Sequence, residues 1–307
     1  MCDSDALARF DAVARRELKP YFDAIGDVIY SANSTLTRND VIFWGINPGG
    51  DPAIRDPIGL MPQVQMTIEA ALDAFRTRDE SMLEVAWPNN GNGRFEELVD
   101  NWPFTRRYRT SDPPDFYPPG QAFYQRRAGH LLGAVVPAAE EAIVSNFVFL
   151  QTLDANQIGG SLANVVRNFC NLPCGDSSDS IKENLQRILK SCWRVHMEIF
   201  AIAKPKVLIV ASKRAWDLIS EYGLLENCTV PIDKCKAGQG EWDCCVYKAH
   251  FRNCDREVLG AGSRRGITII QVPHLSRWPI DVPREDRQRA VQWVACKVQE
   301  AIDKWDF

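Results

Sequence analysis

Four short runs of consecutive apolar residues predict buried strands. They lie at residues 40–44, 141–150, 207–210 and 266–272. Runs of this length, rich in Val and Ile, are typical of strands that are covered on both faces. Strands that alternate with helices along a chain favour a parallel sheet between layers of helices. We therefore expect an α/β fold, an α/β/α sandwich with a central, mostly parallel four-stranded sheet and helices on both faces.

Helical spacing of apolar residues, at every third or fourth position, predicts the covering layers. The predicted helices lie at residues 5–24, 66–75, 122–136, 180–203, 214–221 and 283–304. Two stretches, at about 51–120 and 223–263, fit this alternation poorly because they are rich in Trp, Pro and Asn or in Cys and Gly. We interpret residues 1–307 as a single domain that carries these two stretches as insertions.

Residues able to do chemistry gather where three of the predicted strands end. The first strand runs into residues 45–50, Gly-Ile-Asn-Pro-Gly-Gly, Asn146 interrupts the second apolar run, and His274 and Ser276 follow the last strand. In open α/β sheets, ligands bind beyond the carboxyl ends of the strands. The pattern therefore indicates one site built from three segments.

These segments resemble the motifs of a known family. Residues 45–49, Gly-Ile-Asn-Pro-Gly, resemble the first motif of the uracil-DNA glycosylase superfamily, nearest to its mismatch-specific and single-strand-selective branches. Residues 274–277, His-Leu-Ser-Arg, resemble its last motif, usually His-Pro-Ser-Pro, with Leu275 in the position of a Pro. The resemblance implies a DNA base-excision glycosylase that hydrolyses the N-glycosidic bond of uracil or a related deaminated base.

The resemblance implies two catalytic residues, Asn47 and His274. Cleavage of an N-glycosidic bond builds positive charge on the sugar and negative charge on the departing base, and the target base must first be flipped out of the helix. Asn47 can orient the attacking water, although a neutral carboxamide is a weaker base than a carboxylate, so slow turnover is expected. His274 can donate a hydrogen bond to the base as its charge develops.

Base recognition is assigned to Ile46, Asn146 and Phe123. The backbone around Ile46 can approach the base, and the Asn146 amide can match the carbonyl and N–H on the edge of uracil. Phe123 can stack on the base. Two rivals remain open, Asn164 for the amide and Tyr124 for the stacking ring.

DNA contacts are assigned to residues beside the catalytic pair: Pro48, Gly49, Leu275, Ser276 and Arg277. Ser276 can contact a phosphate, and the wedge that fills the gap left by the flipped base is Leu275, Arg277 or the following Trp278. The chain carries 36 Lys and Arg against 40 Asp and Glu, a formal net charge of −4. Any DNA binding must therefore use a local basic patch rather than bulk charge.

Metal and membrane partners are not expected. Iron–sulfur members of the superfamily use four Cys thiolates, two of them early in the chain, whereas here only Cys2 precedes residue 170 among ten Cys. The Cys-rich residues 223–263 contain no Cys-x-x-Cys pair, so the sequence leaves a zinc site in this segment open. With neither a signal-like start nor an apolar stretch of membrane length, we expect a cytoplasmic monomer without a cofactor.

Two other functions remain open at this stage. Leu275 in place of Pro, Ser212 or Lys213 in place of a usual Gly, and the two insertions favour a catalytically weak superfamily member that binds DNA or modified bases as a sensor. A nucleotide-handling enzyme with a doubly wound sheet rests on analogy of fold alone. Binding to DNA that contains an abasic site would separate these two possibilities.

Overall fold

The structure is a computed structural model. It describes residues 4–24, 26–45, 67–79, 131–135, 142–150, 178–226, 230–236, 243–252, 255, 259, 266–273 and 284–304. The statements that follow concern these residues.

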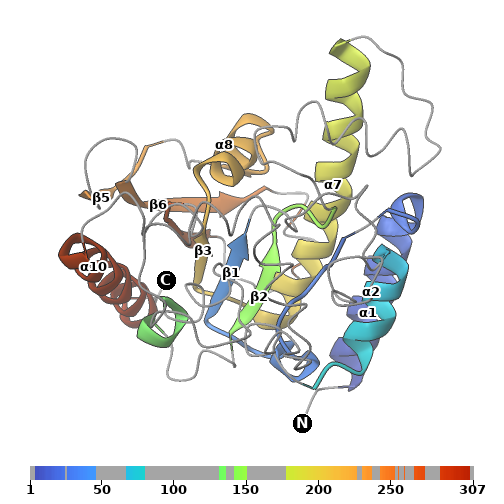
Figure 1. The fold of residues 1–307 in the computed structure, drawn as a ribbon, viewed down its shortest axis with the longest axis horizontal. Helices are drawn as coiled ribbons and strands as arrows, with labels where there is room; N and C mark the ends of the chain where they lie inside the picture. The colour runs from blue at the N-terminus through green and yellow to red at the C-terminus, as the bar shows by residue number, and fades with distance from the viewer. Residues whose placement is uncertain are drawn as a thin grey trace, which may run out of the picture.

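The four predicted strands are present, and all of them are parallel. They are β1 (Val41–Gly45), β2 (Ile143–Asn146), β3 (Val207–Val210) and β7 (Gly266–Gln271). They pair in the order β2-β1-β3-β7. Figure 1 shows β1 and β2 side by side near the middle of the molecule.

The expectation of a four-stranded, mostly parallel sheet is wrong, because the sheet has seven strands and is mixed. Residues 223–263 supply β4 (Leu225–Glu226), β5 (Asp233–Lys236) and β6 (Asp243–Phe251). β6 pairs antiparallel with β7, and β4 and β5 pair antiparallel with β6. This region therefore extends the sheet and satisfies the hydrogen-bonding groups of β7 on the side away from β3.

One face of the sheet is covered by α1 (Ser4–Leu18), α2 (Ile68–Arg76), α7 (Ser178–Ala203) and α8 (Lys213–Glu221). Alternate strand residues, including Ile42, Trp44 and Leu208, join these helices in one buried core. Thus α2, although it lies within the predicted insertion 51–120, packs into the main core through Ile68, Leu72 and Phe75.

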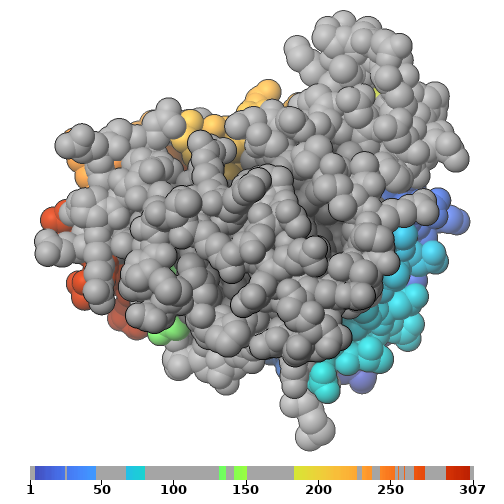
Figure 2. Space-filling model, viewed as in Figure 1, coloured from blue at the N-terminus to red at the C-terminus, as the bar shows by residue number. Residues whose placement is uncertain are grey.

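The opposite face is covered by α10 (Arg284–Asp303) and by helical residues 131–135. The intervening strand residues, such as Phe43, Val144 and Ile209, pack there in a second core with Val294 and Val298. The space-filling view shows α1 and α2 at one margin of the molecule and α10 at the opposite margin (Figure 2). The sheet therefore lies between two layers of helices, as the alternation of apolar runs and helical segments predicts.

The first predicted helix is shorter than expected. α1 ends at Leu18 and is followed by a 3₁₀ turn at Lys19–Tyr21, whereas the apolar spacing predicted helix as far as residue 24. Pro20 explains the difference, because a proline disfavours helical conformation in the residue before it and has no N–H to donate. A second 3₁₀ turn spans Asn33–Thr35.

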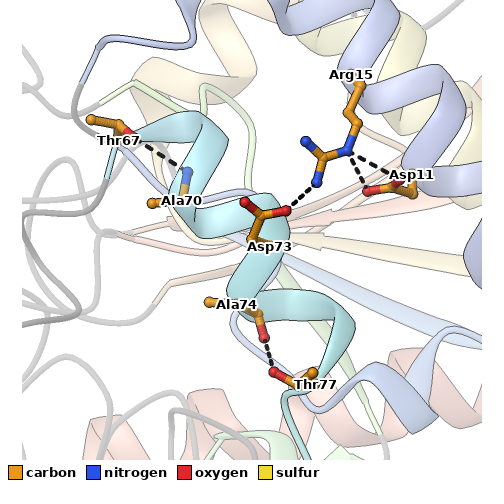
Figure 3. A network of polar contacts seen from close by, with 7 residues as sticks. All are labelled: Asp11, Arg15, Thr67, Ala70, Asp73, Ala74 and Thr77. Carbon is orange, nitrogen blue, oxygen red and sulfur yellow. Dashed lines mark hydrogen bonds and ion pairs between the residues drawn. The ribbon is translucent and has the colours of Figure 1, made fainter.

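A small polar network holds α2 against α1 (Figure 3). Thr67 caps α2, because its hydroxyl accepts a hydrogen bond from the Ala70 N–H at 3.2 Å. Arg15 on α1 donates to Asp11 at 3.0 Å and to Asp73 on α2 at 2.5 Å.

Within the described residues, no helix has the length and apolar character that a bilayer crossing requires.

Candidate functional site

The carboxyl ends of the parallel strands form an aligned edge. Trp44 of β1 is in register with Ser145 of β2 and Val210 of β3, and Val210 is in register with Gln271 of β7. Pairing continues one residue further, since the Phe147 N–H donates to the Gly45 carbonyl at 2.9 Å. The segments that follow β1, β2 and β7 in the sequence therefore all leave from one edge of the sheet.

Asn146 is the predicted site residue that the structure describes. It is the last residue of β2, pairs in register with Gly45 and is 5% exposed. Its Nδ2 donates to the Tyr30 hydroxyl at 2.7 Å. A buried amide requires hydrogen-bond partners, so this bond stabilises a polar side chain at an otherwise apolar level of the sheet.

Residues 26–31 run antiparallel alongside β2 and hold it from its outer side. Bridges join Gly26 to Leu150 and Ile29 to Ser145, and the Ser145 hydroxyl donates to the Val28 carbonyl at 2.5 Å. Gly26 is required for this approach, because a Cβ there would lie 2.1 Å from the Phe149 carbonyl oxygen. The strand that carries Asn146 is therefore fixed on both sides.

A buried histidine lies beneath the same strand end. His196 of α7 is fully buried, and its Nε2 lies 3.1 Å from the Phe147 carbonyl oxygen. Because a carbonyl can only accept, Nε2 carries the proton and Nδ1 is left as an acceptor. Burial lowers the pKa of His196 to about 3, against the raising effect of hydrogen bonds to backbone carbonyls, so the ring is neutral at neutral pH.

The Trp44 ring packs on that histidine with ring centroids 4.1 Å apart. The Trp44 Nε1 and the His196 Nδ1 are buried and have no hydrogen-bond partner in the described part of the chain. Phe147 and Phe200 complete an aromatic cluster around Trp44, with centroids 5.7 and 5.4 Å away. This cluster supports the ends of β1 and β2 from the side of the first core.

A buried ion pair anchors the segment beside β2. Arg78 donates to Asp27 at 3.2 Å and also to the Ile29 carbonyl, and Asp27 accepts from the Val28 N–H at 2.7 Å. Desolvation raises the pKa of Asp27 to about 6, although Arg78 and the Val28 N–H act to lower it. Arg78, two residues beyond the end of α2, thus links this helix to the segment that supports β2.

The other predicted site residues lie outside the described residues. They are Ile46, Asn47, Pro48, Gly49, Phe123, His274, Leu275, Ser276 and Arg277, together with the alternatives Asn164, Tyr124 and Trp278. In the sequence, Asn47 comes two residues after Gly45 of β1, and His274 comes two residues after Val272. The Val272 N–H donates to the Val210 carbonyl at 2.9 Å, so Val272 extends the aligned edge.

Ser212, which with Lys213 is one of two residues expected in the place of a usual Gly of the family that the motifs resemble, has a structural role. It is the N-cap of α8, and its hydroxyl accepts from the Ala215 N–H at 3.3 Å. It is 3% exposed. This residue therefore stabilises the helix that follows β3.

Sequence reasoning missed Tyr30 and His196. His196 could have been found, because it interrupts the apolar face of a long amphipathic helix between Cys192 and Phe200. Tyr30 gives no such signal, because residues 26–31 belong to neither a helical nor an alternating pattern. Its contact with Asn146 joins residues 116 positions apart.

No disulfide joins the cysteines that the structure describes. Cys235 of β5 and Cys244 of β6 are in cross-strand register, and Cys192 is buried in α7. Burial raises the pKa of Cys192 to about 12, so this thiol is protonated and a poor nucleophile. Among the described residues, no group of three or more His, Cys, Asp or Glu side chains is placed to hold a metal ion.

Comparison of the chain with protein-family models, with curated proteins and with solved structures finds no significant match. The functional interpretation therefore rests on the motifs and on the geometry around Asn146.

Proposed function

We propose that this protein is a DNA base-excision glycosylase. It hydrolyses the N-glycosidic bond of uracil, or of a related deaminated base, after that base has been flipped out of DNA. The observation that carries the proposal is a buried amide, Asn146, in register with Gly45, the first residue of the Gly-Ile-Asn-Pro-Gly segment. A buried polar side chain costs stability unless it is hydrogen-bonded, and Asn146 is retained here with one of its amide hydrogens on Tyr30.

The strand order supports this proposal. β2 and β1 are neighbours, and β7 lies two strands from β1. With strands about 4.8 Å apart, the segments after β1 and β7 start about 10 Å apart, comparable with the length of a nucleotide. The three motifs therefore leave from positions that allow them to surround one base and its sugar.

In the proposed reaction, the side chains divide the work. Asn146 reads the edge of the base, Asn47 orients the attacking water, and His274 donates a hydrogen bond to the base as it leaves with negative charge. The water oxygen bonds to the sugar carbon as the bond from that carbon to the base nitrogen breaks, and the base leaves with the electron pair of that bond. The proton that the water releases ends on the base, so the reaction produces a free base and an abasic site. Because Asn47 is a weak base, we propose slow turnover.

The proposal is tested with protein in excess over labelled oligonucleotides that contain uracil, hypoxanthine or xanthine, in single-stranded and double-stranded form. Alkali then cuts the strand at abasic sites. We expect strand breaks with the unmodified protein and a strong loss of breaks with Asn47→Ala. Lys206→Ala serves as a matched control, because Lys206 precedes β3 at the opposite edge and pairs with Asp40 at 3.2 Å.

A second candidate function is a DNA or modified-base sensor with little activity. The departure of Leu275 from the usual Pro of the last motif favours it. Tight binding to DNA with an abasic site, together with no strand breaks from any folded preparation, would select the sensor. Absence of both breaks and binding would contradict both candidates.

A further inference from the structure

Two cysteines oppose each other on β5 and β6, which lie side by side at the outer edge of the sheet (Figure 1). Cys235 of β5 is in register with Cys244 of β6, and neither forms a disulfide. Both lie on the α10 side of the sheet, because Cys244 belongs to the second core and Cys235 packs against that core. Cys245, the next residue of β6, belongs to the first core on the opposite face. The strand pairing therefore brings Cys235 together with Cys244 and not with Cys245.

The spacing of directly opposed residues suits a disulfide bond. In antiparallel strands the Cα atoms of such residues lie about 4.5 or 5.5 Å apart, and the Cα atoms of a disulfide lie about 4.4–6.8 Å apart. Their Cβ atoms lie about 4.5–5.5 Å apart, against about 3.5–4.5 Å across a disulfide. A small movement of β5 toward β6 is therefore enough for the bond to form.

The two thiols differ in exposure, and this difference gives them different roles. Cys235 is half-buried on an edge strand, whereas Cys244 is buried. Burial raises the pKa of Cys244 well above its ordinary range, and the negative charge of the nearby Cys235, Cys245 and Asp243 adds to this effect. A buried, protonated thiol reacts slowly with reagents in solution. Cys235 is therefore the thiol that meets an oxidant, and Cys244 is the thiol that closes the bond.

We propose that Cys235 and Cys244 are a thiol-oxidation site, where a reversible disulfide forms and fastens β5 to β6. The oxidant is a small disulfide of the glutathione class. The Cys235 sulfur attacks this disulfide and forms a mixed disulfide, and the first small thiol leaves with the Cys235 proton. The Cys244 sulfur then bonds to the Cys235 sulfur, and the second small thiol leaves with the Cys244 proton. Two protein thiols are thus oxidised, and one small disulfide is reduced to two thiols.

The bond fastens the sheet beside the carboxyl end of β7. Cys245 is in register with Gln271, the last residue of β7. Without the bond, β5 is held by its pairing with β6 and by the ion pair of Asp233 with Lys297 of α10 at 2.9 Å. A covalent link between the strands suppresses local opening of this edge. The inference is independent of the proposed function, because no residue of the three motifs takes part in it.

The test treats the full-length protein with oxidised glutathione, blocks the remaining thiols by alkylation and maps disulfides by mass spectrometry after digestion with trypsin. Trypsin cuts after Lys and Arg, so Cys235 lies on the peptide 235–236 and Cys244 on the peptide 237–248. We expect these two peptides to be joined through Cys244 and to separate after reduction with dithiothreitol. Fragmentation of the joined peptides distinguishes Cys244 from Cys245.

Three variants assign the two roles. Cys244→Ala should lose the cross-link and leave Cys235 as a mixed disulfide with glutathione. Cys245→Ala, which also removes a buried thiol from β6, is the matched control and should keep the cross-link. Cys235→Ser, at a half-buried position, should lose both the cross-link and the mixed disulfide. A cross-link through Cys245, a mixed disulfide on Cys235 that never closes, or no reaction of Cys235 would overturn the proposal.

Hydrogen exchange measures whether the bond fastens β5. We expect the amide hydrogens of residues 233–236 to exchange about tenfold more slowly after oxidation, because a covalent link suppresses local opening. Reduction with dithiothreitol should restore the original rates. Cys235→Ser should show no change under the same treatment, which separates the effect from oxidation of other cysteines. Equal exchange rates in the oxidised and reduced protein would contradict the fastening of β5.

Discussion

The parallel and antiparallel parts of the sheet are covered in different ways. Every residue of β1, β2 and β3 is buried, because helices lie on both faces. In β5, half-buried and exposed residues alternate, and the nearby Val230 and Ile232 are 73% and 59% exposed. Two-sided burial fixes the ends of the parallel strands, where the candidate site lies, whereas the antiparallel strands extend and protect the sheet.

The largest contrast between the two parts is expected in stability. Trp44→Ala should lower the free energy of unfolding by about 4 kcal/mol, because it empties a fully buried position within an aromatic cluster. Ile232→Ala, at the exposed antiparallel edge, should change it by less than about 0.5 kcal/mol. Urea unfolding of both variants measures these effects. Equal losses would show that the two parts are not covered differently.

The next expected effect is the pH dependence of stability that the buried carboxyl group of Asp27 causes. The pKa of Asp27 is raised from 3.8 to about 6 by burial, so the folded state binds this proton more tightly than the unfolded state does. Stability from this group is fully present below about pH 4 and is lost as the pH rises through 6, by about 3 kcal/mol. Asp27→Asn should remove this fall, as measured by denaturation between pH 4 and 8. An unchanged slope would refute the assignment to Asp27.

A third contrast concerns activity. Asn146→Ala should lower excision of uracil about 100-fold, because a buried base edge loses its hydrogen-bond partner. Lys234→Ala, on the exposed side of β5, should leave excision unchanged. Single-turnover assays on one uracil oligonucleotide measure both. Comparable activity of the two variants would show that Asn146 is not part of the site.

The smallest expected effect lies at the contact of β5 with α10. Lys297 pairs with Asp233 at 2.9 Å, and its hydrogen bond, with one from the Lys234 N–H, lowers the pKa of Asp233. Asp233→Asn should lower stability at neutral pH by less than about 1 kcal/mol, since solvent screens an exposed pair. The difference should vanish in high salt and as the pH falls below the ordinary pKa of Asp. Thermal unfolding at two salt concentrations checks it, and a difference that persists in salt would contradict this explanation.

The sequence was most informative where burial is two-sided. The strands at 41–45 and 207–210 are continuous apolar runs, so they could be located to within a residue. β6 was missed, because its residues mix Lys248 and His250 with apolar side chains, as expected of a strand with one less protected face. The end of α1 was misplaced, because the apolar spacing continues beyond Leu18 although Pro20 stops the helix.

The candidate site was predictable only where a local pattern along the sequence marks one of its residues. Asn146 stands out because it is polar within an apolar run, and the structure places it at the aligned strand ends. Tyr30 and His196 support it through contacts between segments distant in the sequence. The apolar pattern of α7 marks His196 as a polar residue on a buried face, but no local pattern encodes which residue His196 or Tyr30 contacts.

Release of the free base is the most direct measurement of the central claim. The protein is incubated in excess with a single-stranded oligonucleotide that contains one uracil, and mass spectrometry detects both products. The proposed function predicts free uracil and an oligonucleotide with one abasic site in equal amounts, and their absence with Asn47→Ala. An intact oligonucleotide after prolonged incubation, with protein shown to be folded, would contradict the glycosylase function.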